Sequence, residues 1–476
     1  MQAQNLVHRA FIYEVFPTAE QKAMLDRTFG CCRFVYNRAL AELNAAYEAE
    51  KDRDKADKTP FSKMFSEVTK AFSPLSKTEE FGWLRDVYTA CWHNACANLK
   101  DAFDKFFKKN SKRPRFKKKI ARQNLTVMIG NSKNGNFEYK DNFIRVPAKL
   151  GGALKIGKGR AISGKAKKLT ISKTPSGRYF ASIACENSPI SVFEKTGKEV
   201  GLDTGIKSLV VLSDGQSFDG PKPLKNNLRK LKYLQRQLSK KDEFYKAGCR
   251  KQKSSLGENY VKPQRSKRRE KACLKLAKMH ERIGFVRETY LHQITTKIVK
   301  NHDVICVEDL AVKNLMRNHK LARALSDNAI GKFYQFLEYK AGWHGREYQK
   351  IGRFFPSSKT CGACGEIKQD LKLSDREWTC KSCGTKHDRD VNAAKNILKE
   401  GLSILNRSSG GAVVVTDVKG KRGEAPEPSV LKKTDKRRVK KVAQKATKSR
   451  EKILSKKGGS NDKDLCVNTL PDENKG

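Results

Sequence analysis

The sequence predicts a multidomain protein of the α+β class. Three observations support this prediction. Strand-like segments flank a long helical block in the first part of the chain, apolar strands are separated by long charged helices in the second part, and a cysteine array follows. With 476 residues, of which 38% are hydrophobic, the chain is long enough for about two to four domains.

The charge of the chain predicts a polyanionic partner. The formal net charge is +49, and a surface this positive repels itself unless a polyanion such as nucleic acid neutralises it. An anionic membrane is the alternative, but no apolar run approaches the roughly 18 residues of a membrane span. The first residues lack the apolar core of a signal peptide. We therefore expect an intracellular protein without a membrane partner, whose 13 cysteines are metal ligands and buried thiols rather than disulfides.

The first part of the chain predicts a β unit that is interrupted by helices. Residues 8–18 alternate enough to form a strand, and Thr18 and Gln21 then form a capping box. A helical pattern runs from there to about residue 109, and a dense basic run follows it. Residues 124–195 show short alternating segments. We expect a small β-barrel or sheet that begins with the N-terminal strand and contains the helical block as an insertion.

The second part predicts buried strands and a helical hairpin. Residues 198–213 form two apolar strands joined by a tight Thr-Gly turn, and residues 304–310 form another buried strand. Residues 224–300 have the pattern of long charged helices. In the second of these helices, apolar residues recur at steps of three and four, which predicts the packing seam of a helical hairpin. The seam residues are Leu276, Met279, Ile283, Val286 and Tyr290.

The cysteine array predicts a zinc site. Residues 361–364 (CGAC) and 380–383 (CKSC) are two CxxC turns separated by fifteen residues, and two such turns supply the tetrahedral thiolate set that zinc prefers. The alternative, a redox pair, does not explain two matched turns. Four thiolates leave no open position for water, so the zinc is expected to be structural, and nearby His387 is not needed as a ligand. The predicted ligands are Cys361, Cys364, Cys380 and Cys383. Cysteines in helical patterns are predicted to be core residues, among them Cys31, Cys32, Cys91 and Cys96.

Two acids end apolar strands. Asp203 follows Val200–Leu202, and Glu308 follows residues 304–307. A carboxylate in the middle of an apolar sheet is costly unless it is paired or binds a metal ion. Each acid alone is equally compatible with a strand end that faces solvent.

A third acid comes from the stretch HDRDVNAAKNIL, residues 387–398, which is either the charged start of a surface helix or the source of a metal ligand. In a helix that begins near Asp388, the residues Asp390, Ala394 and Ile397 share one face. Asp388 lies about 200° away from Asp390. We therefore predict that Asp390 points with the apolar face, and that the paired alanines let this helix approach a sheet closely.

Three converging carboxylates suit hard divalent cations such as Mg²⁺. Two such ions about 4 Å apart activate a water molecule and stabilise the leaving oxygen of a phosphodiester. A nuclease site of this kind agrees with the nucleic-acid partner that the charge predicts.

These stretches resemble a known family. GLDTGIKSLVVLSDG, VICVEDLAVKNL, FPSSKTCGACG and DRDVNAAKNIL are similar to the RuvC-type nuclease and zinc ribbon of TnpB, the transposon-encoded, RNA-guided endonucleases related to type V CRISPR effectors. YEVFPTAEQ, CCRFVYNRAL and RPRFKKK match the same family, so the resemblance covers roughly residues 8 to 400. Carried over by position, the catalytic acids of the family are Asp203, Glu308 and Asp390.

The resemblance also implies an architecture. An N-terminal β-barrel wedge domain is interrupted by a helical recognition domain, and an RNase H-like (RuvC) α/β domain with an inserted zinc ribbon follows. A disordered basic tail ends the chain. The expected boundaries are 1–18 and 121–196 for the wedge, 19–120 for the recognition domain, 197–354 and 387–407 for RuvC, 355–386 for the ribbon and 408–476 for the tail.

As implied by the resemblance, the protein binds a guide RNA, recognises a short duplex motif beside a double-stranded DNA target, and cuts both strands at one site with two Mg²⁺ ions, while one Zn²⁺ ion is structural. Base pairing reads the sequence and basic residues contact phosphates. One basic cluster is the best local candidate for phosphate contact, and the alternative is that it is only a solvated run of charges. Its members are Arg113, Arg115, Lys117, Lys118, Lys119 and Arg122. Three residues of the helical block are candidates for contact with the duplex motif, and it is equally consistent with the sequence that they are core residues. They are Tyr88, Trp92 and His93.

Two alternatives stay open. A compact type V CRISPR effector differs in the origin of its guide, and an RNA-guided DNA-binding repressor has lost catalysis, against which the presence of all three acids argues. The resemblance implies a prokaryotic, cytoplasmic protein associated with the nucleoid. A monomer is favoured, although the sequence does not fix the oligomeric state.

Overall fold

The computed structural model of the protein describes residues 4–54, 57–128, 137–140, 142–257, 260–261, 263–372 and 374–408. All of them lie in the first of two units into which the chain divides, Met1–Ala412 and Val413–Gly476. The tail predicted for residues 408–476 lies outside the described residues, except for Ser408, which ends the last helix.

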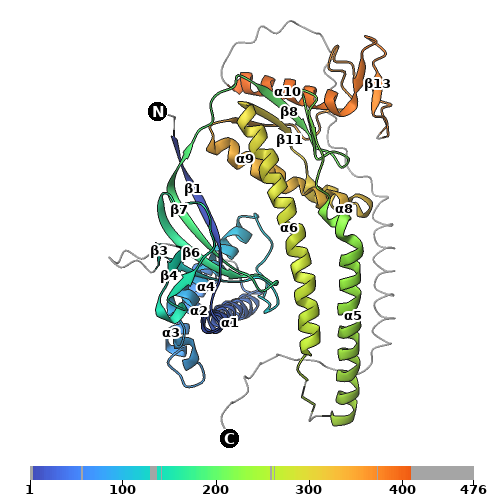
Figure 1. Ribbon diagram of the computed structural model, residues 1–476. Helices are drawn as coiled ribbons and strands as arrows, with labels where there is room; N and C mark the ends of the chain where they lie inside the picture. Colours follow the sequence, from blue (N-terminus) through green and yellow to red (C-terminus); the bar gives the residue numbers. More distant parts are fainter. Residues whose placement is uncertain are drawn as a thin grey trace. The chain divides into compact units, whose positions relative to one another are not determined.

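The N-terminal strand pairs with a strand that is distant in the sequence. An antiparallel sheet has the order β1 (Gln4–Val15), β7 (Tyr179–Ser191), β6 (Lys165–Lys173) and β2 (Gln123–Met128). The paired residues of β1 and β7 run from Gln4 with Ser191 to Val15 with Tyr179. The helical block is therefore an insertion between strands of one sheet, as the sequence predicts (Figure 1).

A smaller sheet in the same part of the chain lies beside the end of β1. It contains the three strands β3 (Glu138–Lys140), β4 (Phe143–Arg145) and β5 (Ala153–Lys155). A bridge between Val15 and Ile156 links it to β1.

In the described part of the chain the N-terminal strands form two open sheets and no closed barrel, so the barrel in the prediction is not confirmed. Helices pack against the edge strand β2, and the side-chain amide of Asn94 donates to the carbonyl of Thr126 in this strand (3.0 Å).

The inserted helical block consists of α1 (Ala19–Ala49), α2 (Phe61–Lys70), α3 (Phe72–Leu75) and α4 (Thr89–Phe107). The predicted capping box at the start of α1 is confirmed, because Thr18 and Gln21 exchange side-chain to backbone hydrogen bonds of 3.0 and 3.3 Å. Helices and sheet share one hydrophobic core. As predicted, this core includes Cys31, Cys32, Cys91 and Cys96.

The second part of the chain forms a five-stranded mixed sheet, which is called the second sheet below. Its order is β10 (Ser217–Phe218), β9 (Val210–Leu212), β8 (Glu199–Asp203), β11 (Val304–Glu308) and β12 (Glu347–Ile351). β8, β11 and β12 are parallel, whereas β9 and β10 are antiparallel to their neighbours.

Helices cover both faces of this sheet (Figure 1). Alternate residues such as Val200, Leu202 and Ile305 pack with α6 (Lys267–Asn301), α8 (His319–Asn328) and α9 (Ile330–Trp343). The opposite face, with Gly201 and Cys306, receives α10 (Arg389–Ser408). Coverage on both faces explains why these strands are almost uniformly apolar.

A long helical hairpin is formed by α5 (Pro223–Leu256) and α6. Leu276, Met279 and Ile283 pack with Leu231 of α5, which confirms the first part of the predicted seam. Val286 is 43% exposed, so the seam prediction is wrong there. Tyr290 packs instead against the core of the second sheet, because α6 leaves the hairpin at this level.

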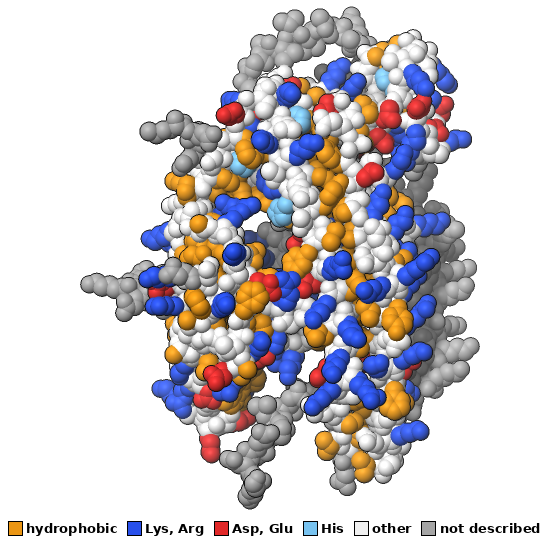
Figure 2. All heavy atoms as spheres, in the orientation of Figure 1, with side chains coloured by type: hydrophobic (Ala, Val, Ile, Leu, Met, Phe, Trp, Pro, Cys, Tyr) orange, Lys and Arg blue, Asp and Glu red, His pale blue; other side chains and the backbone are white. Residues whose placement is uncertain are grey.

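The remaining elements are short. α7 (Val312–Leu315) follows β11, and β13 (Glu377–Thr379) and β14 (Lys386–Asp388) form a two-stranded sheet directly before α10. None of the described helices is long and apolar enough to span a membrane. On the face shown in Figure 2, Lys and Arg side chains clearly outnumber Asp and Glu.

Candidate active site and cysteine cluster

The second sheet brings two of the predicted acids to the same edge. β8 and β11 are adjacent and parallel, with Leu202 opposite Val307. Asp203 and Glu308 each follow one residue later and end their strands. Because the carboxyl ends of parallel strands meet at one edge of a sheet, the two side chains are neighbours, and both are half-buried.

The third acid is delivered by close packing of α10 on this sheet. Ala393, Ala394 and Ile397 are fully buried, which confirms the prediction of an alanine-lined approach. The approach also needs two glycines that the sequence reasoning missed. A Cβ atom on Gly201 would lie 2.0 Å from the carbonyl oxygen of Ala394, and one on Gly401 would lie 2.3 Å from the Cys306 sulfur.

The first turn of α10 gives its two acids different roles. The Oδ1 atom of Asp388 accepts hydrogen bonds from the backbone amides of Asp390 (3.0 Å) and Val391 (2.9 Å), so Asp388 is the N-cap and is exposed. Asp390 is half-buried, and its Oδ2 atom lies 3.3 Å from Nη1 of Arg376. This geometry supports Asp390, not Asp388, as the acid of the site.

The charges of the three acids interact. Burial, together with the negative charges of Glu308 and Asp390, raises the pKa of Asp203 to about 7, although the charge of Arg389 acts in the opposite direction. Burial also raises the pKa of Glu308, and the hydroxyl of Ser357, which donates to its Oε1 atom, opposes this. A bound cation would offset this mutual repulsion, so the donor set fits a hard divalent ion.

The residue after Asp203 is fixed by a buried tyrosine. The hydroxyl groups of Thr204 and Tyr334 lie 2.8 Å apart. Burial raises the pKa of Tyr334 well above its ordinary value, and the nearby charges of Glu308 and Asp203 act in the same direction. Tyr334 therefore stays neutral and holds the end of β8 in place.

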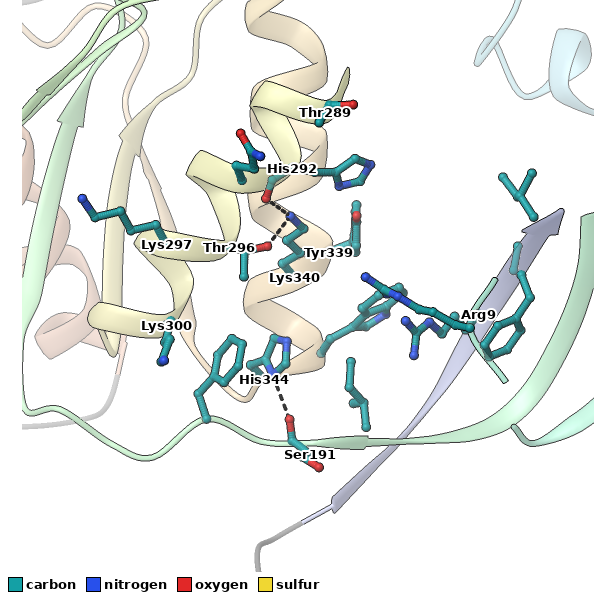
Figure 3. A pocket seen from close by; sticks show the side chains of 18 of the residues that line it. Arg9, Ser191, Thr289, His292, Thr296, Lys297, Lys300, Tyr339, Lys340 and His344 are labelled. Carbon is teal, nitrogen blue, oxygen red and sulfur yellow. Dashed lines mark hydrogen bonds between the residues drawn. The ribbon is translucent and has the colours of Figure 1, made fainter. Parts of the chain in front are cut away.

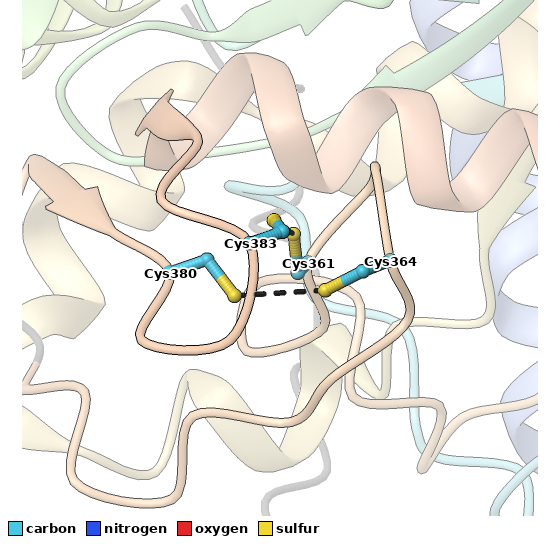
Figure 4. Close-up of side chains that lie close together, drawn as sticks. All are labelled: Cys361, Cys364, Cys380 and Cys383. Carbon is cyan, nitrogen blue, oxygen red and sulfur yellow. Dashed lines mark hydrogen bonds between the residues drawn. The ribbon is translucent and has the colours of Figure 1, made fainter.

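The four predicted zinc ligands form a compact cluster (Figure 4). Among the described residues they are the one group of three or more His, Cys, Asp or Glu side chains whose ligand atoms all lie within 4.8 Å of one another. The members of this group are Cys361, Cys364, Cys380 and Cys383. The three acids are thus more widely spread than the thiolates.

The sulfur spacing fits zinc. The Sγ atoms of Cys361 and Cys383, and those of Cys364 and Cys380, lie 3.6 Å apart. A tetrahedral zinc with Zn–S bonds of about 2.3 Å needs sulfur atoms about 3.8 Å apart. The Nε2 atom of His387 lies 3.0 Å from the Cys361 sulfur, so this residue stands beside the cluster as a hydrogen-bond partner.

The predicted phosphate-contact cluster is exposed except for Lys117. Lys117 is half-buried, with its ammonium 3.9 Å from the centre of the Tyr36 ring, and burial lowers its pKa. Arg113 donates to Asn44 (2.8 Å). None of the six residues forms an ion pair with a carboxylate in the described ranges, which leaves their charge available to a phosphate.

The three candidates for duplex contact differ in their exposure. Trp92 is 2% exposed and belongs to the core, which agrees with the second of its two predicted roles, a core residue, and not with duplex contact. Tyr88 is half-buried against the same core. His93 is exposed and stacks on Trp92, with ring centres 3.8 Å apart. Of the three, His93 is the most exposed.

A cationic cavity of about 1700 Å³ lies between the N-terminal sheet and helices α6 and α9, and sequence reasoning did not find it. Its lining includes Arg9, Arg160 and Trp343, but no Asp or Glu. Lys340 at its wall donates 2.8 Å hydrogen bonds to the carbonyl of His292 and to the hydroxyl of Thr296 (Figure 3). It also donates to the hydroxyl of Thr295 (2.8 Å). Burial and the charge of Arg160 lower the pKa of Lys340 to about 8.

Three family models match the chain. They are a helix-turn-helix domain at residues 1–52, a model described as "Probable transposase" at 182–319, and a Cas12f1-like TNB domain at 331–397.

The chain also has curated relatives. A protein of Streptomyces pristinaespiralis named as an RNA-guided DNA endonuclease is 38% identical over 402 residues, which cover 83% of this chain and 90% of that protein. InsQ of Escherichia coli K12, which is also named as an RNA-guided DNA endonuclease, is 29% identical over 412 residues. These residues cover 83% of this chain and 93% of InsQ. A TnpB-like protein of Acanthamoeba polyphaga mimivirus is 27% identical over 242 residues, which cover 50% of this chain and 44% of that protein. On these matches, the chain belongs to the TnpB family.

Proposed function

We propose that the protein is an RNA-guided endonuclease that cuts both strands of a DNA target at one site, formed by Asp203, Glu308 and Asp390. The observation that carries this proposal is the approach of three acids from β8, β11 and α10, close enough for Glu308 and Asp390 to raise the pKa of Asp203. Membership of the TnpB family supports guidance by RNA, and the RNase H-like (RuvC) assignment is part of the proposal.

The chain provides the ligands and their support. The three carboxylates would hold two magnesium ions, which when bound supply an activated water and stabilise the leaving oxygen. Tyr334 and Thr204 fix the end of β8 beside this site. One structural zinc ion would be held by the four-cysteine cluster, whose sulfur spacing fits it.

We infer that the cationic cavity and the 113–122 cluster contact nucleic-acid backbone. The cavity combines basic residues with Trp343 and Tyr339 and has no acid in its lining, so it attracts phosphates and offers faces on which bases stack. Contacts of this kind carry no sequence information, which agrees with a protein whose guide RNA reads the target by base pairing.

The proposal is tested by cleavage of a matched DNA target with purified protein, guide RNA and magnesium. Asp390→Ala and Asp203→Ala should abolish cleavage and retain binding of guide and target, because only the cation ligands are lost. Asp388→Ala is the matched control and should still cut. Normal cutting by Asp390→Ala together with none by Asp388→Ala would show that the wrong acid is assigned.

The guide is identified by purifying the protein from its native host and sequencing the RNA that accompanies it. We expect one RNA that is encoded beside the gene, from a transposon end rather than a repeat array. Repeat-derived RNA would instead indicate a CRISPR effector, and the absence of any bound RNA would contradict RNA guidance.

A further inference from the structure

Two buried asparagines of α10 hold the segment that leads into the cysteine cluster. The amide group of Asn396 donates to the carbonyls of Ser357 (2.8 Å) and Thr360 (2.7 Å), and that of Asn392 donates to Thr360 (2.7 Å). The backbone amide of Gly362 donates back to Asn392 (2.9 Å). These bonds fix residues 357–362 against the same helix that carries Asp390.

The two ends of this segment meet the two candidate metal sites. At one end, the hydroxyl of Ser357 donates to the Oε1 atom of Glu308, at the end of β11. At the other end, Cys361 is the first member of the cysteine cluster. Ser357 is 4% exposed, so water has little access to replace its hydroxyl on Glu308. Only three residues of chain, held by α10, thus separate Ser357, the partner of a proposed magnesium ligand, from a proposed zinc ligand.

We propose that Ser357 is a positioning residue for Glu308, and that the metal-loaded cysteine cluster keeps Ser357 in place through residues 357–361. This inference depends on the proposed function. The Ser357 hydroxyl occupies one oxygen of Glu308 and leaves the other for a cation. Hydrogen-bond partners of this kind orient a ligating carboxylate and commonly change metal affinity about 10- to 100-fold. Zinc at the cluster and the cation at the acids are then thermodynamically coupled, although no ligand is shared.

The packing around the segment favours such coupling. A Cβ atom on Gly362 would lie 2.9 Å from Oδ1 of Asn392, so the first cysteine turn lies directly on α10. The hydroxyl of Thr360 donates to the carbonyl of Pro356 (2.9 Å), which closes the segment into a turn. A displacement of Cys361 therefore moves Ser357, because the asparagine bonds and this turn connect the two.

The test measures binding of Mn²⁺ alone, as a probe of the acid site, to the zinc-loaded full-length protein by paramagnetic resonance of the free ion. Ser357→Ala should weaken Mn²⁺ binding about tenfold, at unchanged zinc content, and Ser357→Thr, which retains a hydroxyl, should recover most of this affinity. Ser358→Ala is the matched control and should bind Mn²⁺ as the wild type does. Should Ser357→Ala fail to fold, Asn396→Ala, which removes the two bonds that Asn396 donates to the segment, replaces it.

Coupling is tested by combining two changes. Cys361→Ser should weaken Mn²⁺ binding in the wild-type background and should have little further effect in Ser357→Ala, since both act through the same contact. Cys249→Ser, on α5 and outside the cluster, is the control for the cysteine change.

Two results would overturn the proposal: wild-type Mn²⁺ affinity in Ser357→Ala, or fully additive effects of Ser357→Ala and Cys361→Ser. Asp390→Ala separates these from failure of the proposed function. If Asp390→Ala binds Mn²⁺ normally, the acid site itself is misassigned, and both proposals fall.

Discussion

The cysteine cluster and the acid site are two candidate metal sites of opposite construction. The thiolates come from two turns separated by fifteen residues, and their sulfur atoms all lie within 4.8 Å of one another. The acids come from three elements that are distant in the sequence: β8 and β11 pair side by side, and α10 brings Asp390 toward them by packing tightly on this sheet. A site made of local turns is specified by spacing alone, whereas a site made of distant elements depends on the whole domain.

Removal of zinc should have the largest effect, and it should be local. Structural zinc contributes about 10 to 16 kcal/mol in small zinc domains. Cys380→Ser should therefore strongly increase hydrogen exchange between residues 361 and 388, while the N-terminal sheet keeps its protection. Mass-spectrometric hydrogen exchange with a metal assay measures both. Equal protection in mutant and wild type would show that the cluster needs no metal to fold.

Loss of a ligand should have the opposite effect at the acid site. When no magnesium is added, removal of the Asp203 charge should stabilise the folded protein. The folded-state pKa of Asp203 is raised to about 7, so the folded protein binds the proton more tightly than the unfolded chain, and stability falls as the pH rises from about 4 to 7. Asp203→Asn should remove this penalty and raise the free energy of unfolding at pH 8 by up to about 4 kcal/mol, since each pH unit between the two pKa values contributes about 1.4 kcal/mol.

Urea unfolding at pH 5 and pH 8 measures this effect, and the gain should shrink at pH 5. Asp370→Asn, at an exposed acid of the cysteine region, is the control and should change stability little at either pH. A loss of stability in Asp203→Asn at pH 8 would mean that the three carboxylates do not repel one another in the folded protein.

Gly201→Ala probes the packing that assembles the acids. The added Cβ would meet the backbone of α10 at 2.0 Å, so we expect a loss of about 1 to 3 kcal/mol and weaker cation binding at the acids. Gly248→Ala, in α5 with nothing within 4 Å, is the control and should be neutral or stabilising. Calorimetry and Mn²⁺ titration measure the two effects; unchanged cation binding would show that the acids do not depend on this approach.

Asp388→Ala should have the smallest effect. Loss of the N-cap of α10 should cost about 1 kcal/mol of stability, and cleavage should continue. Thermal unfolding and a cleavage assay measure this. A stability cost together with complete loss of cleavage would mean that Asp388 does more than cap the helix.

The difference between the two sites also explains what the sequence could predict. Spacing predicted the cysteine cluster, and strand ends and a helical face predicted three acids whose charges lie close enough to interact. Ser357, Gly201 and the cationic cavity were missed because they act through contacts between distant elements. Val286 was misjudged for a similar reason, since a helical pattern shows that one face is apolar but not where the neighbouring element ends.

The pairing of β1 with β7 has a consequence for how the protein is made. Gln4 pairs with Ser191, so the first strand emerges from the ribosome long before its partner exists. Until residues 179–191 have been synthesised, β1 has no neighbour on the side that β7 will occupy, and an unpaired strand edge is a template for aggregation. The helical block is synthesised during this interval, and its early folding would hold the chain compact until β7 completes the sheet.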